Sequence, residues 1–185
     1  MTVQYVLDTN VLIQAIKGYY SHEICPGFWE FLIHGFESNV IFSIDRVYGE
    51  LTEKDQKDWV AEWAKANKKF FQDCDDDVGN HVARICSISY VKRFKQSQIA
   101  AFHDVADPWL IGYAKKHGMT VVTLEGTKDA QSKIKIPSIC EELGVPVINT
   151  FQMLEKLKAR FVQNGRSPSF PPPYSHPQLK FEDEP

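Results

Sequence analysis

Short apolar runs alternate with amphipathic stretches along most of this chain. Four of the runs are uniformly apolar and rich in β-branched residues, which predicts strands buried on both faces. They cover residues 3–7, 40–44, 120–124 and 145–148. Strands that alternate with helices predict an α/β domain with a central parallel sheet of four to five strands, joined by right-handed crossovers.

Between these runs, apolar residues recur at helical spacing. Helices are expected around residues 28–36, 59–64, 82–89, 108–116, 139–143 and 151–161. The segment 46–118 lies between the second and third expected strands. Its pattern is nearly all helical, so we expect it to form a helical insertion that caps or flanks the sheet.

The C-terminal end of the chain has a different composition. Six of the ten prolines fall beyond residue 163, where apolar residues are sparse. Such a segment buries too little surface to offset the entropy lost on ordering. We therefore expect one domain over residues 1–162 and a proline-rich, disordered tail over residues 163–185.

Composition narrows the class of protein. With 185 residues, 43% of them hydrophobic and 24% charged, the chain suits one globular domain. Lys and Arg number 21 against 24 Asp and Glu, for a net charge of −3, which argues against nonspecific coating of nucleic acid. A polyanion would have to be held by a local patch or by metal ions.

Cysteine usage and hydropathy bear on location. The four cysteines form no CxxC pair and are interpreted as reduced structural thiols of a cytosolic protein. The N-terminus lacks the pattern of a signal peptide, and no stretch approaches the roughly 20 apolar residues of a membrane span. The expected location is therefore cytoplasmic, with no membrane partner.

Four acidic residues stand where strands end or helices begin. Asp8 follows the first apolar run and Glu125 follows the third, so both are expected at the carboxyl edge of the sheet, where parallel sheets bind ligands. Glu50 follows the second run as a strand gives way to a helix. Asp107 precedes Pro108, a residue suited to a first helical position, so helix capping alone is the simplest interpretation of Asp107. Convergence of all four acids on one rim favours a functional site.

Clustered carboxylates predict a particular chemistry. They repel one another unless protons or cations are bound. Oxygen ligands without a nearby His or Cys favour Mg²⁺ or Mn²⁺ over zinc. Such ions polarise a phosphodiester and lower the pKa of a bound water for in-line attack.

These motifs resemble those of PIN-domain nucleases. The resemblance rests on Asp8-Thr9-Asn10, Gly49-Glu50-Leu51, Asp107 in the run from Ala106 to Ile111, and Glu125 after residues 121–123. It covers roughly residues 2–161. The segments 135–140 and 143–145 make it most similar to a PIN-like branch of unassigned function, the DUF4411 type.

The resemblance implies a three-layer α/β/α fold and a metal-dependent endoribonuclease that cleaves single-stranded RNA, commonly the toxin of a toxin–antitoxin pair. Asp8, Glu50, Asp107 and Glu125 would then be direct or water-mediated ligands of Mg²⁺ or Mn²⁺. Asn10 and Thr123 would position these ligands or water, and Asp104, one helical turn before Asp107, is an auxiliary acid. A protein antitoxin and a homodimer are the partners that the resemblance suggests.

Other features have ordinary structural interpretations beside functional ones. The six histidines show no metal-ligand spacing. Tyr48 and Trp109 stand beside candidate acids and suit either base stacking or the core. Basic residues of the insertion suit either an RNA backbone or a solvated helix face; they are Lys54, Lys57, Lys65, Lys68, Lys69, Arg84, Lys92, Arg93 and Lys95.

Two rival functions remain at this stage. A phosphatase with an aspartyl nucleophile would want a second Asp two residues after Asp8, where this chain has Asn10. A catalytically silent PIN-like module that binds RNA or a protein is the stronger rival. Metal binding by the four carboxylates distinguishes it from a nuclease.

Overall fold

A five-stranded parallel sheet forms the centre of the molecule. The computed structural model describes residues 3–53, 58–126 and 133–161. Its strands are β1 (Tyr5–Leu7), β2 (Ile41–Ile44), β3 (Phe71–Gln72), β4 (Thr120–Val122) and β5 (Val147–Ile148). They lie in the order β3-β2-β1-β4-β5, and every neighbouring pair is parallel. The predicted α/β class and sheet are confirmed.

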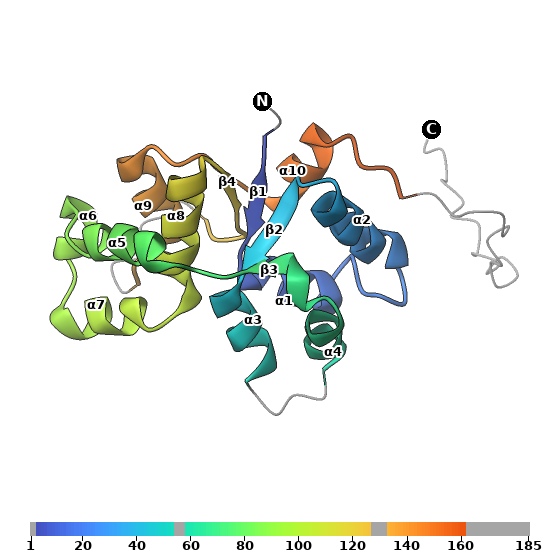
Figure 1. The fold of residues 1–185 in the computed structure, drawn as a ribbon, viewed down its shortest axis with the longest axis horizontal. Helices are drawn as coiled ribbons and strands as arrows, with labels where there is room; N and C mark the ends of the chain where they lie inside the picture. The colour runs from blue at the N-terminus through green and yellow to red at the C-terminus, as the bar shows by residue number, and fades with distance from the viewer. Residues whose placement is uncertain (1–2, 54–57, 127–132, 162–185) are drawn as a thin grey trace, which may run out of the picture.

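Helices cover both faces of the sheet (Figure 1). On one side lie α1 (Thr9–Lys17), α2 (Pro26–Glu37), α3 (Asp45–Thr52), α4 (Trp59–Ala66) and α10 (Thr150–Lys156). On the other lie α5 (Asp76–Ile85), α6 (Ser89–Lys92), α7 (Gln96–His103), α8 (Ala106–His117) and α9 (Ile136–Leu143). The 3₁₀ turn η1 (Lys68–Phe70) leads into β3. The expected three layers are thus present.

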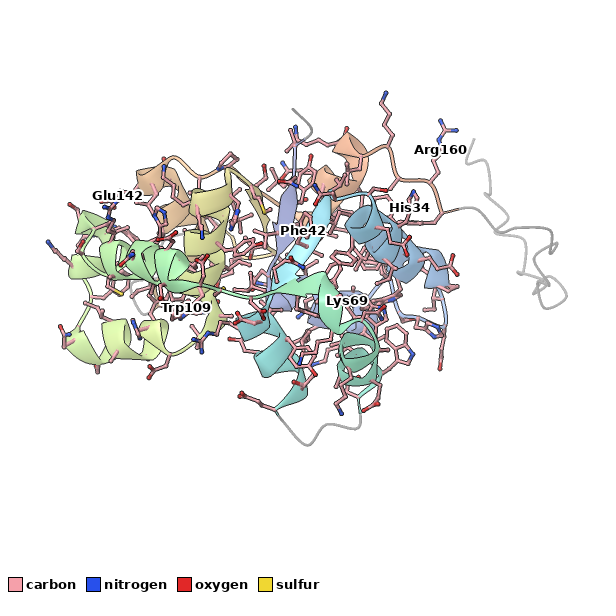
Figure 2. The ribbon with its side chains drawn as sticks, in the orientation of Figure 1. His34, Phe42, Lys69, Trp109, Glu142 and Arg160 are labelled. Carbon is pink, nitrogen blue, oxygen red and sulfur yellow. The ribbon has the colours of Figure 1, made fainter. Side chains whose placement is uncertain are left out.

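The strands form because their residues are buried on both faces. All residues of β1, β2 and β4 are buried, which explains why the sequence shows no alternation there. Figure 2 shows Phe42 on β2 near the middle of the fold, and its ring packs edge-on against Phe36 of α2 at 6.0 Å. The sheet therefore provides a fixed frame for the loops at its edges.

Local signals set the helix boundaries. Pro26 starts α2, and Gly118 and Gly144 end α8 and α9 with φ of 66° and 65°, a conformation that glycine adopts without strain. Glu142 of α9 accepts hydrogen bonds from the backbone N–H groups of Ser89 and Tyr90, at 2.9 and 3.0 Å (Figure 2). This side chain satisfies the amino end of α6 and ties α6 to α9.

Three sequence predictions need correction. The insertion contains β3, a two-residue edge strand, besides its helices. The helix expected over 82–89 is two helices: the Asp75 carboxylate caps α5 at Val78 N (3.1 Å), so α5 begins at Asp76 and ends at Ile85. The helix expected over 151–161 ends at Lys156, because Lys158 has a φ of 52° that a helix cannot continue through.

Three further expectations concern the cysteines, membrane spans and the C-terminal tail. All four cysteines are free thiols. Within the described residues, no helix has the length and apolar character needed to cross a membrane. The expected tail over residues 163–185 lies outside the described residues.

Candidate functional site

The strand order creates a crevice between β1 and β4. These strands are neighbours, with Tyr5 beside Thr120 and Leu7 beside Val122. The chain leaves β1 toward β2 on one side and leaves β4 toward β5 on the other. In open α/β sheets, ligands bind at this switch point, outside the carboxyl ends of the strands. Asp8 and Thr123 are the first residues beyond those ends.

Asp8 is held in a network of polar groups at this point. Its side chain occupies the N-cap position of α1 without capping the helix, and only 3% of the residue is exposed. Asp8 Oδ2 accepts a hydrogen bond from the Thr123 hydroxyl at 2.7 Å. Thr123 Oγ1 in turn accepts from Asn10 Nδ2 and from Glu125 N, both at 3.1 Å. The predicted positioning residues Asn10 and Thr123 therefore lie beside Asp8 and orient its carboxylate.

Glu50 joins three helices at the same edge. It lies on α3, and its Oε2 accepts a hydrogen bond from the Thr9 hydroxyl of α1. Its Oε1 accepts from the backbone N–H of Ala106 at 2.8 Å, which satisfies one of the free N–H groups at the start of α8. Both carboxylate oxygens are thus engaged.

Asp107 lies in the first turn of α8 and does not cap it. The helix begins at Ala106, with Val105 at the N-cap position, so the interpretation of Asp107 as a capping residue is wrong. Proline is tolerated throughout the first helical turn because N–H groups there have no intrahelical partner, and Pro108 therefore did not mark the first position. The Asp107 side chain lines the cavity instead.

Glu125 is the most tightly paired of the four acids. It follows β4 by three residues. Its Oε1 accepts from Lys133 Nζ at 2.9 Å and Lys135 Nζ at 3.2 Å, and its Oε2 accepts from Ile136 N at 2.9 Å. The pKa of Glu125 lies below its usual value, because these donors outweigh the burial that would raise it.

One cavity of about 620 Å³ brings the four acids together. Asp8, Glu50, Asp107 and Glu125 all line it, although they come from four separate parts of the chain. We call it the acid cavity. Its other described lining residues are Thr9, Asn10, Ile13, Gln14, Gln98, Ala101, Phe102, Val105, Lys133 and Ile134.

Two of these acids bind protons unusually tightly. Burial raises the pKa of Asp8 to about 6, with smaller contributions from the charges of Glu125 and Glu50, against the hydrogen bond from Thr123. Burial and the charge of Asp8 raise the pKa of Asp107 to about 7, which Lys133 lowers only in part. The two carboxyl groups are therefore close enough to repel each other, and a bound cation would relieve that repulsion.

The donor set fits a hard divalent cation in its chemistry. Carboxylate oxygens facing a cavity of this kind suit Mg²⁺ or Mn²⁺. Among the described residues, however, no group of three or more His, Cys, Asp or Glu has the geometry of a preformed metal site. The hydrogen bonds of Glu50 and Glu125 explain this, since they hold both carboxylates against protein donors. Asp8 and Asp107 are the pair whose charge is least compensated.

Other predicted residues lie elsewhere. Asp104 follows α7, its side chain is 82% exposed beside His103, and it does not line the acid cavity. Tyr48 packs edge-on against Phe71 at 5.5 Å, while the Arg46 guanidinium lies 4.3 Å from the ring centre of Trp109. Both aromatic rings therefore have partners within the fold.

The basic residues of the insertion are dispersed. Lys65 pairs with Glu62 at 2.8 Å, Lys68 lies over the Tyr48 ring and Arg93 lies over the Tyr90 ring. These contacts are those of ordinary surface side chains. Lys54 and Lys57 lie outside the described residues.

The sequence did not reveal several residues of the site. Thr9 binds Glu50, Lys133 and Lys135 bind Glu125, and Phe102 of α7 lines the cavity. Thr9 had a signal, since it stands between two selected residues. The lysines had none, because isolated lysines before a helix are common on protein surfaces.

Comparisons with known proteins give a family and a fold likeness. The model of the DUF4411 family, described as a domain of unknown function, matches residues 5–161. No curated protein matches the chain. The structure is similar to FitAcB from Neisseria gonorrhoeae, with 16% identity, a TM-score of 0.48, and coverage of 80% of this chain and 99% of that one. It is also similar to DNA-bound VapBC from Salmonella typhimurium, with 18% identity, a TM-score of 0.45, and coverage of 80% and 98%.

Proposed function

This chain belongs to the DUF4411 family, and from that premise we propose that it is a metal-dependent endoribonuclease that cleaves single-stranded RNA, in the role of a toxin of a toxin–antitoxin pair. One observation carries the proposal. Asp8, Glu50, Asp107 and Glu125 line one cavity at the switch point of the sheet, in the order that the resemblance to PIN-domain nucleases implies. The toxin role and the preference for RNA rest on that resemblance.

Asp8 and Asp107 are the residues that would hold Mg²⁺ or Mn²⁺ directly. Both face the cavity, and burial gives both a raised pKa. When bound, the ion supplies Lewis-acid activation of water and stabilisation of the leaving oxyanion. Glu50 and Glu125 would act through water, because protein donors already occupy their oxygens.

The chain's own residues orient the Asp8 carboxylate in the cavity. Thr123 fixes one oxygen of Asp8 by donating to it, and Asn10 fixes Thr123. Lys133 lies at the rim of the cavity, where its ammonium group is paired with Glu125. A phosphate that enters the cavity would meet this ammonium, which favours binding of the anionic strand.

The test is a cleavage assay on single-stranded RNA with titrated Mn²⁺. We expect Asp8→Asn and Asp107→Asn to lower the rate by at least about 100-fold, since removal of one essential charged group costs several kcal/mol of transition-state stabilisation. Asp104→Asn is the matched control, because Asp104 lies outside the cavity, and should cleave like the wild type.

Several outcomes would overturn parts of the proposal. Cleavage that persists in chelator, or in both Asp variants, contradicts the metal mechanism. A single-stranded DNA of the same sequence, with deoxyuridine in place of thymidine, tests the substrate class, because only the 2′-hydroxyl groups then differ. Faster cleavage of that DNA than of the RNA contradicts an endoribonuclease.

A catalytically silent module is the second candidate. The observation that favours it is the lack, among the described residues, of three acids arranged to hold one ion. Such a module would bind single-stranded RNA equally well with or without Mn²⁺ and leave it intact. A nuclease requires that Mn²⁺ reach Asp8 and Asp107 and that cleavage follow.

The partner proposals also rest on the resemblance. We propose a protein antitoxin that covers the acid cavity, and a homodimer of this chain. An antitoxin that inserts a basic side chain among the acids would compete with Mn²⁺, so its inhibition should weaken as Mn²⁺ is raised. Inhibition independent of Mn²⁺ would contradict that mode, and light scattering of the purified chain tests the dimer.

A further inference from the structure

A second cavity adjoins the acid cavity at the end of α1. Its volume is about 460 Å³, and Asn10, Gln14 and Glu125 line both cavities. Its remaining lining residues are Val11, Ala15, Gly18, Tyr19, Tyr20, Leu124, Thr150 and Phe151. They come from α1, from the turn after it, from the segment after β4 and from the start of α10. A ligand in the acid cavity can therefore extend into this second cavity.

Exposed aromatic rings stand at the second cavity. Tyr19 is 82% exposed and Phe151 is 55% exposed, so both rings present much of their surface to solvent at this cavity. The neighbouring Tyr20 is stacked on Phe28 at 4.5 Å, and Phe151 lies 6.2 Å from the Tyr20 ring. Phe151 therefore contacts Tyr20 at an angle, and its exposed ring surface is available to a planar ligand.

Thr150 supplies an unpaired polar group in the wall of the same cavity. The residue is only 4% exposed, and its Oγ1 has no hydrogen-bond partner within the described structure. Buried hydroxyl groups are normally paired, so an unpaired one calls for an explanation. The Oγ1 atom is itself buried, so the hydroxyl would have to rotate toward the cavity, where the polar edge of a ligand would provide the missing partner.

The charge of the lining indicates which part of a nucleotide fits. Among the described residues, Lys, Arg and His are absent from the wall of the second cavity. Its one acid, Glu125, is already paired with Lys133 and Lys135. A phosphate group would find no cation there, whereas a neutral base would find aromatic faces and a hydroxyl group.

We propose that the second cavity is a nucleobase subsite. A base next to the scissile phosphate of single-stranded RNA stacks on Phe151 and Tyr19, and the Thr150 hydroxyl contacts its polar edge. This inference rests on the proposed function, since it assigns a base-binding role to the surface beside the acid cavity. Stacking on aromatic rings is how proteins hold single-stranded nucleic acids.

The experiment measures RNA affinity without cleavage. Fluorescence anisotropy in chelator gives the Kd of a short single-stranded RNA for the full chain. We expect Phe151→Ala and Tyr19→Ala to raise Kd by roughly 5- to 100-fold, the effect of losing a stacked base. Phe151→Tyr should restore binding, because it keeps the ring. Ile24→Ala is the matched control, since Ile24 is 76% exposed outside the cavity, and should leave Kd unchanged.

An abasic RNA series distinguishes stacking from a general loss of structure. Each RNA in the series lacks one base, at a different position. At one of these positions, the missing base should weaken wild-type binding by the same factor as Phe151→Ala weakens binding of the intact RNA. At that position, the Phe151→Ala variant should lose nothing further. Thr150→Val should change the preference among the four bases in the cavity while the mean affinity stays within about twofold.

Outcomes that overturn the subsite differ from those that overturn the nuclease. Unchanged Kd in Phe151→Ala and Tyr19→Ala contradicts the subsite, even if the wild type cleaves RNA. Equal weakening of intact and abasic RNA at every position also contradicts it. Binding that follows the base series without any cleavage in Mn²⁺ contradicts the proposed reaction and leaves the subsite supported.

Discussion

At the scale of single residues, two carboxyl groups at one sheet edge have pKa values shifted in opposite directions. Asp8 and Glu125 both follow strands, yet burial raises the pKa of Asp8 to about 6, while Ile136 N–H and two lysines keep the pKa of Glu125 low. Asp107 resembles Asp8, with a pKa of about 7. In the metal-free site, Asp107 therefore still binds a proton part of the time near neutral pH, Asp8 releases its proton near pH 6, and Glu125 stays ionised.

The raised pKa values of Asp8 and Asp107 predict that the stability of the fold depends on pH. The folded-state pKa values of Asp8 and Asp107 exceed the ordinary value of 3.8, so the folded state binds more protons than the unfolded chain between about pH 4 and pH 7. The metal-free fold should lose stability as pH rises through this window, by on the order of 2–4 kcal/mol for each carboxyl group.

Urea denaturation in chelator checks this prediction. At pH 8, metal-free Asp107→Asn should be more stable than the wild type by at least about 1 kcal/mol, because it removes the buried charge. At pH 4 the difference should be small. Asp104→Asn serves as the control, and an identical pH profile for wild type and Asp107→Asn would refute the assigned acidities.

The hydrogen bond from the Thr123 hydroxyl should lower the pKa of Asp8. Its hydrogen bond stabilises the ionised carboxylate, so Thr123→Val should raise the Asp8 pKa by about 1–2 units. Mn²⁺ must displace that proton. In calorimetry, the Mn²⁺ affinity of Thr123→Val relative to the wild type should therefore be markedly lower at pH 6.5 and much less reduced at pH 8.5. Thr120→Val, an equivalent change at a buried position in β4, the strand that Thr123 follows, should have neither effect. A loss of affinity independent of pH would contradict the role of Thr123.

The site was only partly predictable at this scale. The four acids could be selected because parallel strands bring their carboxyl ends to one edge. The contact of Thr9 with Glu50 joins residues 41 positions apart, and no local pattern encodes such a pair. The same holds for the lysines on Glu125, whose role depends on how the chain returns toward α9.

At the scale of elements, the apolar runs were predicted correctly as strands, whereas β3 and two helix boundaries were not. The runs that became β1, β2 and β4 are mostly apolar and buried throughout, and they have one interpretation. β3 has only two residues, fewer than any periodicity requires. The start of the third expected helix, at residue 82, was misplaced because α5 begins at a polar run, Asp76 and Asp77, whose role is electrostatic at the helix start.

The close packing of α2 on β2 predicts how a substitution at Gly35 changes the stability of the fold. A Cβ on Gly35 would lie 2.5 Å from Ile41 Cδ1 and 2.7 Å from Cγ1, and Ile41 is fully buried. Gly35→Ala should destabilise the fold by about 1–3 kcal/mol in urea denaturation, against the helix propensity of alanine. Gly79→Ala in α5, where a Cβ meets only ordinary contacts with Trp109, should be neutral or stabilising. Equal effects would contradict this packing.

At the scale of the whole molecule, topology determines where chemistry can occur. The order β3-β2-β1-β4-β5 leaves one switch point, between β1 and β4, and both cavities described above adjoin it through Asn10 and Gln14. The sequence predicted the parallel sheet because strands alternate with helices along the chain, and the three layers were expected from the resemblance to PIN-domain nucleases. The strand order also required long-range pairing, which the sequence alone does not show.

The central claim is that the acid cavity binds a divalent cation through Asp8 and Asp107. Electron paramagnetic resonance of free Mn²⁺, titrated with the full chain at pH 8, measures this binding without any substrate. We expect saturable binding by the wild type and by Asp104→Asn, and a loss of affinity of at least about tenfold in Asp8→Asn and in Asp107→Asn. Equal binding by all four proteins, or no saturable binding by the wild type, would contradict the claim.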